Sequence, residues 1–150
     1  MYWNIYWNRS ERSNNHGGMV TMNFHVIENG FRTELGYGEL LISGNENDGF
    51  RPFELMITSI VGCAGSVFLK ILEKQRTRFE DLSITVEIER NPEEANRLEW
   101  LKLNFTIKGY NLNIDRLYKN LELSRKNCSM IRSVEKSIKI EETLQIIELS

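Results

Sequence analysis

The sequence lacks a surplus of positive charge, a long uncharged apolar run and an apolar leader. Its 19 lysines and arginines face 21 aspartates and glutamates, for a net charge of -2, so phosphate-directed nucleic-acid binding is not expected. The uncharged run at its apolar centre, Leu55 to Leu69, is shorter than the roughly 20 residues that cross a bilayer. The segment from Met1 to Asn8 has neither a basic start nor an apolar run. We therefore expect a cytoplasmic protein with neither nucleic acid nor membrane as a partner.

Cysteine and histidine are also scarce. Two cysteines, Cys63 and Cys128, are too few for a disulfide scaffold or a four-thiolate zinc site. The two histidines, His16 and His25, are best interpreted as solvated surface residues rather than as bases or metal ligands. No nucleophile elbow, phosphate-binding loop or dinucleotide glycine motif occurs. We therefore expect no bound metal or cofactor, and the thiols become the main candidates for chemistry.

What the chain does have is an ordinary globular composition, with 41% hydrophobic and 27% charged residues over 150 positions. That length favours one domain. The segment 1–18 differs, because a short Tyr-Trp-Asn repeat is followed by a polar stretch rich in glycine, asparagine and serine. We expect residues 1–18 to form a flexible N-terminal extension and residues 19–150 to form the folded domain.

Hydrophobic periodicity predicts the order βββ-α-ββ-α-α-β. Alternating apolar residues favour strands, and apolar residues three or four positions apart favour helices. Because no βαβ repetition is visible, we expect an α+β fold, an antiparallel sheet with a long central helix. The segments are strands near 22–26, 31–35, 39–43, 84–88, 101–107 and 138–146, and helices near 53–75, 113–121 and 131–134.

The long predicted helix carries two distinct faces. One is a stripe of large apolar residues that extends from Phe53 to Leu72. The neighbouring face consists of residues with small side chains. Two of them, Gly62 and Gly65, each destabilise a helix interior by about 1 kcal/mol relative to alanine. Such residues indicate that another backbone segment approaches closely.

The surroundings of the two thiols in the sequence differ. Cys63, within an apolar helix, taken alone is more typical of an inert core cysteine. Cys128 precedes a predicted helix, where free backbone N–H groups favour a thiolate, and Arg125, Lys126 and Arg132 add positive charge nearby. Local physics thus favours Cys128 as the more acidic thiol, with a plain capping role as the alternative.

Two motifs resemble a known family. The run Arg51–Met56, containing Pro-x-Glu-Leu, is followed by a Gly-Cys pair within Ser59–Ser66, and a second cysteine lies in Asn127–Met130. These motifs, with the same element order from Val20 onward, are similar to the OsmC/Ohr family of osmotically inducible and organic hydroperoxide resistance proteins.

The resemblance implies a thiol peroxidase that reduces organic hydroperoxides. Cys63 would be the peroxidatic thiol, Cys128 would resolve its sulfenic acid as a disulfide, and an external dithiol would reduce that disulfide. It also implies an intertwined homodimer. The alternative is a non-catalytic dimer of the same fold that binds a small ligand or partner, with structural or redox-sensing cysteines.

In the family, an arginine–glutamate pair lowers the pKa of the first cysteine, and here the match is imperfect. Hydroperoxide-reducing members place the glutamate directly after the proline, where this chain has Phe53, and Glu54 comes one residue later. Arg32 is the best match for the arginine and Arg51 is the second choice. Glu54 and Cys63 would lie about 13 Å apart on opposite sides of one straight helix. A thiol activated by Glu54 would therefore belong to another subunit. The alternative role for Glu54 is a favourable charge in a first helical turn.

Overall fold

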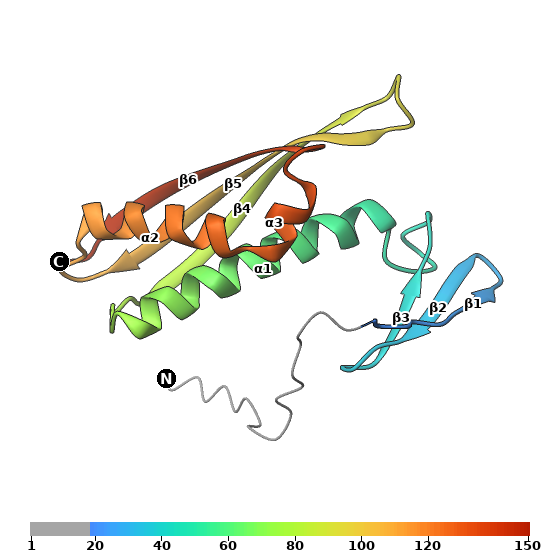
Figure 1. Cartoon of the computed structure of the whole chain (residues 1–150), viewed down its shortest axis with the longest axis horizontal. Coiled ribbons are helices and arrows are strands. Elements are labelled where there is room, and N and C mark those ends of the chain that lie inside the picture. The colour runs from blue at the N-terminus through green and yellow to red at the C-terminus, as the bar shows by residue number, and fades with distance from the viewer. Residues whose placement is uncertain (1–18) are drawn as a thin grey trace. The chain divides into compact units, whose positions relative to one another are not determined.

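The computed structural model describes residues 19–150 (Figure 1). The extension expected at residues 1–18 lies outside the described residues. The chain divides into two compact units, Met1–Gly49 and Phe50–Ser150. Each unit is described separately below.

The first unit is a three-stranded antiparallel sheet of β1 (Phe24–Ile27), β2 (Gly30–Glu34) and β3 (Glu39–Ile42), in that order. A two-residue turn of Glu28 and Asn29 joins β1 to β2. At Gly30 a Cβ atom would lie 2.0 Å from the carbonyl oxygen of Ile42, so only glycine fits there.

This unit buries very little apolar surface. Its apolar side chains are largely exposed, and its described buried residues, Thr33 and Ser43, are polar. A sheet that buries so little apolar surface gains little stability from the hydrophobic effect. The exposed apolar side chains include Met22, Phe24, Val26 and Phe31.

The second unit begins with α1 (Pro52–Lys74), the helix that the apolar stripe predicts. Pro52 occupies the first turn, where its missing N–H leaves no hydrogen bond unmade, and Glu54 adds a favourable charge there. The buried side chains follow the helical period at Ile57, Ile60, Ala64, Phe68 and Leu72.

The second unit continues with a sheet of β4 (Asp81–Asn91), β5 (Arg97–Gly109) and β6 (Lys139–Glu148), in that order. Strands β4 and β5 are antiparallel, but β5 and β6 are parallel, so the sheet is mixed rather than purely antiparallel. The reason is the crossover that joins them, which holds α2 (Ile114–Asn127) and α3 (Ser129–Val134). The predicted element order and the α+β class are confirmed.

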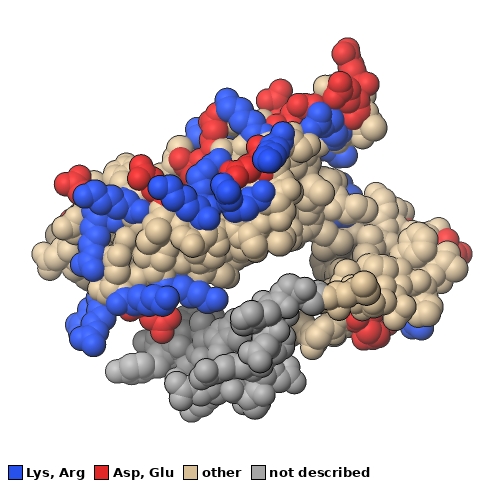
Figure 2. Space-filling view, viewed as in Figure 1, with Lys and Arg blue, Asp and Glu red and all other residues tan. Residues whose placement is uncertain are grey.

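The core lies between this sheet and the helices, which cover one of its faces (Figure 1). Alternate residues of β5 point inward and are fully buried: Leu101, Leu103, Phe105 and Ile107. Phe68 of α1 meets Phe105 edge to face, with ring centroids 5.4 Å apart. The opposite face carries mixed charges (Figure 2), including the ion pair of Lys102 with Glu87. This face therefore has the character of a solvated surface.

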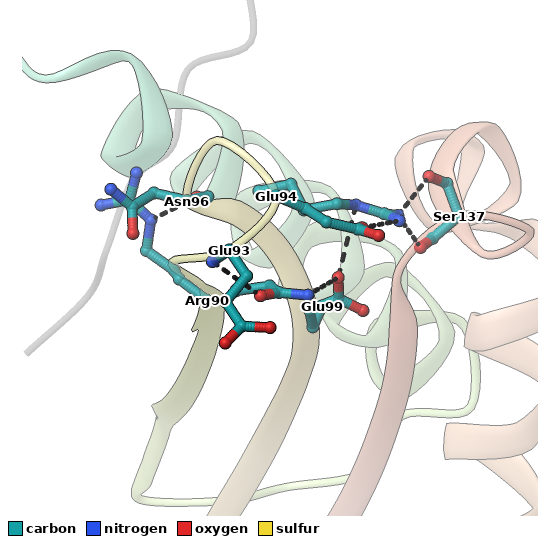
Figure 3. Close-up of polar contacts among 8 residues, drawn as sticks. Arg90, Glu93, Glu94, Asn96, Glu99 and Ser137 are labelled. Carbon is teal, nitrogen blue, oxygen red and sulfur yellow. Dashed lines mark hydrogen bonds and ion pairs between the residues drawn. The ribbon is translucent and has the colours of Figure 1, made fainter.

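The β4–β5 hairpin is tied to the turn that follows α3. Arg97 donates from Nη2 to the carbonyl oxygen of Ser137 at 2.8 Å and to its hydroxyl at 3.0 Å. Its guanidinium also pairs with Glu94 at 3.5 Å and Glu99 at 3.6 Å, within the network drawn in Figure 3. One arginine thus fixes the hairpin against the end of the α3 segment.

Much of α1 is not covered by the described chain. The helix is long and apolar enough to span a membrane, with an 18-residue window of mean hydropathy 2.0 of which 28% is buried. Core helices of soluble proteins have the same length and composition, and α1 packs its Phe68 face on the sheet as such a helix does. Its uncovered side includes Met56 and Leu69, and no described atom beyond the adjacent residues and backbone of α1 itself lies within 4 Å of a Cβ built at Gly62.

Candidate functional site

The fold brings the two cysteines together. Cys63 lies in the middle of α1, and Cys128 lies at the break between α2 and α3, which packs on α1. Ser129, the first residue of α3, places its Oγ 3.6 Å from the Cys63 Sγ, although 66 positions separate the two residues in the chain. The thiols of Cys63 and Cys128 are close enough that each shifts the pKa of the other. Neither cysteine is in a disulfide.

Cys128 is the N-cap of α3. Its extended backbone, with φ -83° and ψ 107°, turns the chain out of α2 and into α3, and its Sγ accepts a hydrogen bond from the Ile131 N–H at 3.5 Å. The residue has no exposed surface. The predicted capping position of Cys128 is therefore present.

Cys63 is partly exposed, and its sulfur receives several hydrogen bonds. Partial burial by itself raises the pKa of this thiol, but the Met130 N–H, the Cys128 thiol and both the hydroxyl and N–H of Ser129 stabilise the thiolate. The net result is a Cys63 pKa below that of an ordinary cysteine. The first backbone N–H groups of α3 thus act on the sulfur of a different helix.

The buried thiol behaves in the opposite way. Burial is the largest cause that raises the pKa of Cys128, and the interaction with Cys63 and the negative charge of its thiolate act in the same direction. The N–H groups of Ile131 and Met130 oppose them only in part, and the net result is a Cys128 pKa of about 11. The expectation from local sequence that Cys128 is the more acidic thiol is wrong, because burial raises the pKa of Cys128 while the N–H groups of Ser129 and Met130 lower the pKa of the partly exposed Cys63.

Arg51 and Glu54 form a pair at the start of α1. The Arg51 Nη2 donates to the Glu54 Oε1 at 2.6 Å, and this hydrogen bond holds the pKa of the Glu54 carboxyl below its usual range. Phe53 lies beside them, with the Arg51 guanidinium 5.1 Å and the Arg90 guanidinium 4.3 Å from its ring centroid. Phe53, the residue after the proline, therefore makes cation–π contacts with both arginines.

The sequence matches the family model described as OsmC-like protein over residues 44–143. This match spans most of the chain, including both cysteines. The chain belongs to the OsmC-like protein family. A comparison with curated proteins found no match.

Solved structures share the OsmC-like fold at low sequence identity. A hypothetical protein from Aquifex aeolicus VF5 aligns with a TM-score of 0.78 at 20% identity over 89% of this chain and 99% of its own. An OsmC-like protein from Mycoplasma pneumoniae gives 0.74 at 11% identity, over 87% and 99%. An organic hydroperoxide resistance protein from Elizabethkingia anophelis gives 0.63 at 14% identity, over 89% and 99%. At such identities these alignments establish the fold alone.

Within this OsmC-like chain, the residues predicted for the site fall into three groups. Cys63 and Cys128 are together. Glu54 pairs with Arg51, the second choice for the arginine, in the first turn of α1. Arg32, the first choice, lies on β2 of the other unit and pairs with Glu39 of β3 at 3.6 Å.

Sequence reasoning gave no role to Ser129 or to the Met130 N–H. Both follow Cys128 directly, so the Cys-Ser-Met run at a predicted helix start was the available signal. Their contact with Cys63 depends on how α3 packs against α1, which local sequence does not encode. Among residues 19–150, no three side chains of His, Cys, Asp or Glu are grouped as they would be to hold a metal ion.

Proposed function

We propose that this OsmC-like protein is a thiol-dependent peroxidase that reduces organic hydroperoxides with Cys63 and Cys128. The observation that carries this proposal is the set of hydrogen bonds from the start of α3 to the Cys63 sulfur, with a second thiol beside it. A partly exposed thiolate next to a buried thiol is the arrangement that a two-cysteine cycle requires.

In the first step, the Cys63 thiolate attacks the terminal oxygen of the hydroperoxide. The S–O bond forms as the O–O bond breaks, and the leaving alkoxide takes a proton to become an alcohol. Cys63 becomes a sulfenic acid, so the sulfur is oxidised by two electrons and the peroxide is reduced by two. The lowered pKa of Cys63 increases the fraction of nucleophilic thiolate relative to an ordinary cysteine at the same pH.

In the second step, the Cys128 sulfur attacks the sulfenic sulfur of Cys63. The S–S bond forms, the S–O bond breaks, and the leaving hydroxide combines with the Cys128 proton as water. The negative charge on Cys63 is one of the causes that raise the Cys128 pKa. Because sulfenic acid formation removes that charge, Cys128 becomes easier to deprotonate once Cys63 has reacted, which favours the second step.

The cycle closes when an external dithiol reduces the Cys63–Cys128 disulfide by two electrons. Such a reductant is available in a reducing cytoplasm, which is the compartment we propose. The chemistry needs no metal or organic cofactor.

We also propose that two copies of the chain form a homodimer. The uncovered side of α1 combines Met56 and Leu69 with the small residues Thr58, Ser59 and Gly62, a surface on which a second helix can pack closely. Burial of the exposed apolar side chains of the first unit against a second copy would likewise stabilise the assembly. A second copy also allows the Arg51–Glu54 pair to approach a thiol that it cannot reach along its own helix. Sedimentation of a stable monomer at micromolar concentration would contradict this assembly.

The peroxidase proposal is tested by peroxide consumption in single-cysteine variants. Reduced protein mixed with cumene hydroperoxide is expected to lose two thiols per chain and to form one intrachain disulfide. Cys63→Ser should abolish consumption, because a hydroxyl is a far poorer nucleophile at neutral pH. Cys128→Ser should react once and retain a sulfenic or more oxidised Cys63. Cumyl alcohol, which lacks the O–O bond, serves as the control ligand.

Two other outcomes of this experiment would contradict the proposal. If Cys128→Ser stops the first turnover and Cys63→Ser does not, the roles of the two thiols are reversed. If neither variant changes peroxide consumption, the enzyme proposal fails and the non-catalytic dimer with structural or redox-sensing cysteines takes its place.

A further inference from the structure

A cleft of about 350 Å³ lies in the second unit, where α1 ends and α2 begins. The turn after α1, the loop after β5 and the first turn of α2 line it, and three of its lining residues are Arg76, Arg78 and Arg116. It is separate from the thiols, because Cys63 lies about 18 Å from the end of α1 along the helix axis. The proposed peroxidase cycle does not use it.

The cleft is strongly basic. No carboxylate lines it, and none of its three arginines takes part in the ion pairs recorded among residues 19–150. Figure 2 shows basic side chains over this end of the unit. Acids near the lining residues include Glu73 and Glu80 in the sequence, Asp115 in the first turn of α2, and Glu148, whose carboxylate accepts hydrogen bonds from the N–H groups of Asn111 and Leu112.

One of the arginines is held in place by a pair of amide side chains, of which Gln75 is partly buried and Asn120 is buried. The Arg116 Nε donates to the Gln75 Oε1 at 2.6 Å. Gln75 and Asn120 exchange two side-chain hydrogen bonds of 2.8 Å each, and Asn120 is only 3% exposed. Because Nε is fixed, the Arg116 guanidinium is oriented before any ligand arrives, which lowers the entropy lost on binding.

A second arginine occupies a position where the fold favours glycine. The Arg76 N–H bonds to the Glu73 carbonyl and the Thr77 N–H to the Leu72 carbonyl, which is the hydrogen-bond pattern of a helix end that calls for a left-handed residue. Arg76 has φ 53°, in that left-handed region. The backbone conformation at this position would be adopted more easily by glycine, so Arg76 carries its cationic side chain at an energetic cost.

We infer that this cleft binds a small organic phosphate. Three guanidiniums around one cleft provide more N–H donors than the terminal oxygens of a phosphate dianion can accept, with charges of matching sign. The volume is at the low end for ligand pockets, which fits a phosphate ester with a small organic group. Tyr110, half exposed at the rim, offers a ring against which that group can pack.

The inference is tested by calorimetric titration of the full-length protein with phenyl phosphate. The native chain should show saturable binding of one phosphate per chain. Arg116→Gln should weaken it at least about tenfold, the loss expected for one charge-assisted contact. Lys136→Gln removes the same charge in the same unit outside the cleft, and its affinity should stay within about twofold of the native value.

Arg76→Gly separates binding from folding. Glycine suits the left-handed position, so the melting temperature should stay equal or rise, while the affinity for phenyl phosphate falls at least about tenfold. The inference is overturned if native protein shows no saturable binding, or if Arg76→Gly and Arg116→Gln keep native affinity. It is also overturned if Lys136→Gln weakens binding as much as they do, since the attraction would then be diffuse.

Discussion

The starts of α2 and α3 are built alike and used differently. At α2, Asn113 caps the helix in the ordinary way, with its Oδ1 accepting from the Arg116 N–H at 2.9 Å. At α3, the cap is the sulfur of Cys128, which accepts from the Ile131 N–H at 3.5 Å. Both caps have nearly the same extended backbone, with ψ 103° and 107°.

The difference lies in where the free N–H groups of the first turn go. At α3, the N–H groups of Ser129 and Met130 stabilise the thiolate of Cys63 on another helix. The same backbone feature thus completes a helix in one place and sets the acidity of a side chain in the other. A helix-start argument applied along the sequence assigns the benefit to the nearest residue, whereas packing decides which residue receives it.

The largest expected effect is the difference between the alkylation rates of the two thiols. With iodoacetamide at pH 7, Cys63 in Cys128→Ser should react at least about a hundredfold faster than Cys128 in Cys63→Ser. The Cys63 pKa is lowered, so its rate should rise with pH below the range of a model cysteine peptide. The Cys128 pKa is raised, to about 11 beside Cys63, so its rate should rise only above that range. Faster reaction of Cys128 at pH 7 would reverse the comparison.

A smaller effect is expected from removing one N–H group at each helix start. Ser129→Pro fits the first helical position, since Cys128 before it is extended, and it deletes the N–H and hydroxyl that contact Cys63. The alkylation rate of Cys63 at pH 7 should fall roughly tenfold. Ile114→Pro makes the same change at α2 after the extended Asn113 and should leave that rate unchanged. Equal effects of the two variants would show that the N–H groups of α3 have no special role.

The smallest expected effect concerns the cap itself. Asn113→Ala should lower the free energy of unfolding by about 1 kcal/mol, because the Arg116 N–H loses its partner. Denaturant unfolding measures this change. The alkylation rate of Cys63 should not change in this variant, so a slower rate would mean that the two helix starts are coupled.

The sequence alone predicts the elements of this fold better than their pairing. The stripe from Ile57 to Leu72 has the helical period, and β5 alternates cleanly, so both elements follow from local physics. The parallel pairing of β5 with β6 does not, because it depends on how the α2–α3 crossover returns the chain to the sheet.

The pairing of the two cysteines was predicted from the resemblance to the OsmC/Ohr family and not from local sequence properties. The resemblance implied that Cys63 and Cys128 act together, and the structure places them side by side. The acidity of Cys63 depends on Ser129 and Met130, which are far from it in the chain. The Arg51–Glu54 pair, in contrast, is visible as a three-residue spacing at a helix start. Nothing in the sequence indicated that Arg90 stacks on Phe53.

The parallel pairing of β5 with β6 also bears on the order in which the molecule folds. The β4–β5 hairpin closes a short loop and can form early, whereas β6 joins β5 only after the α2–α3 crossover has been closed. Cys128 lies in that crossover, 65 positions after Cys63, so their contact also closes a longer loop than the β4–β5 hairpin does. In a newly made chain the thiol pair is therefore expected to form after that hairpin.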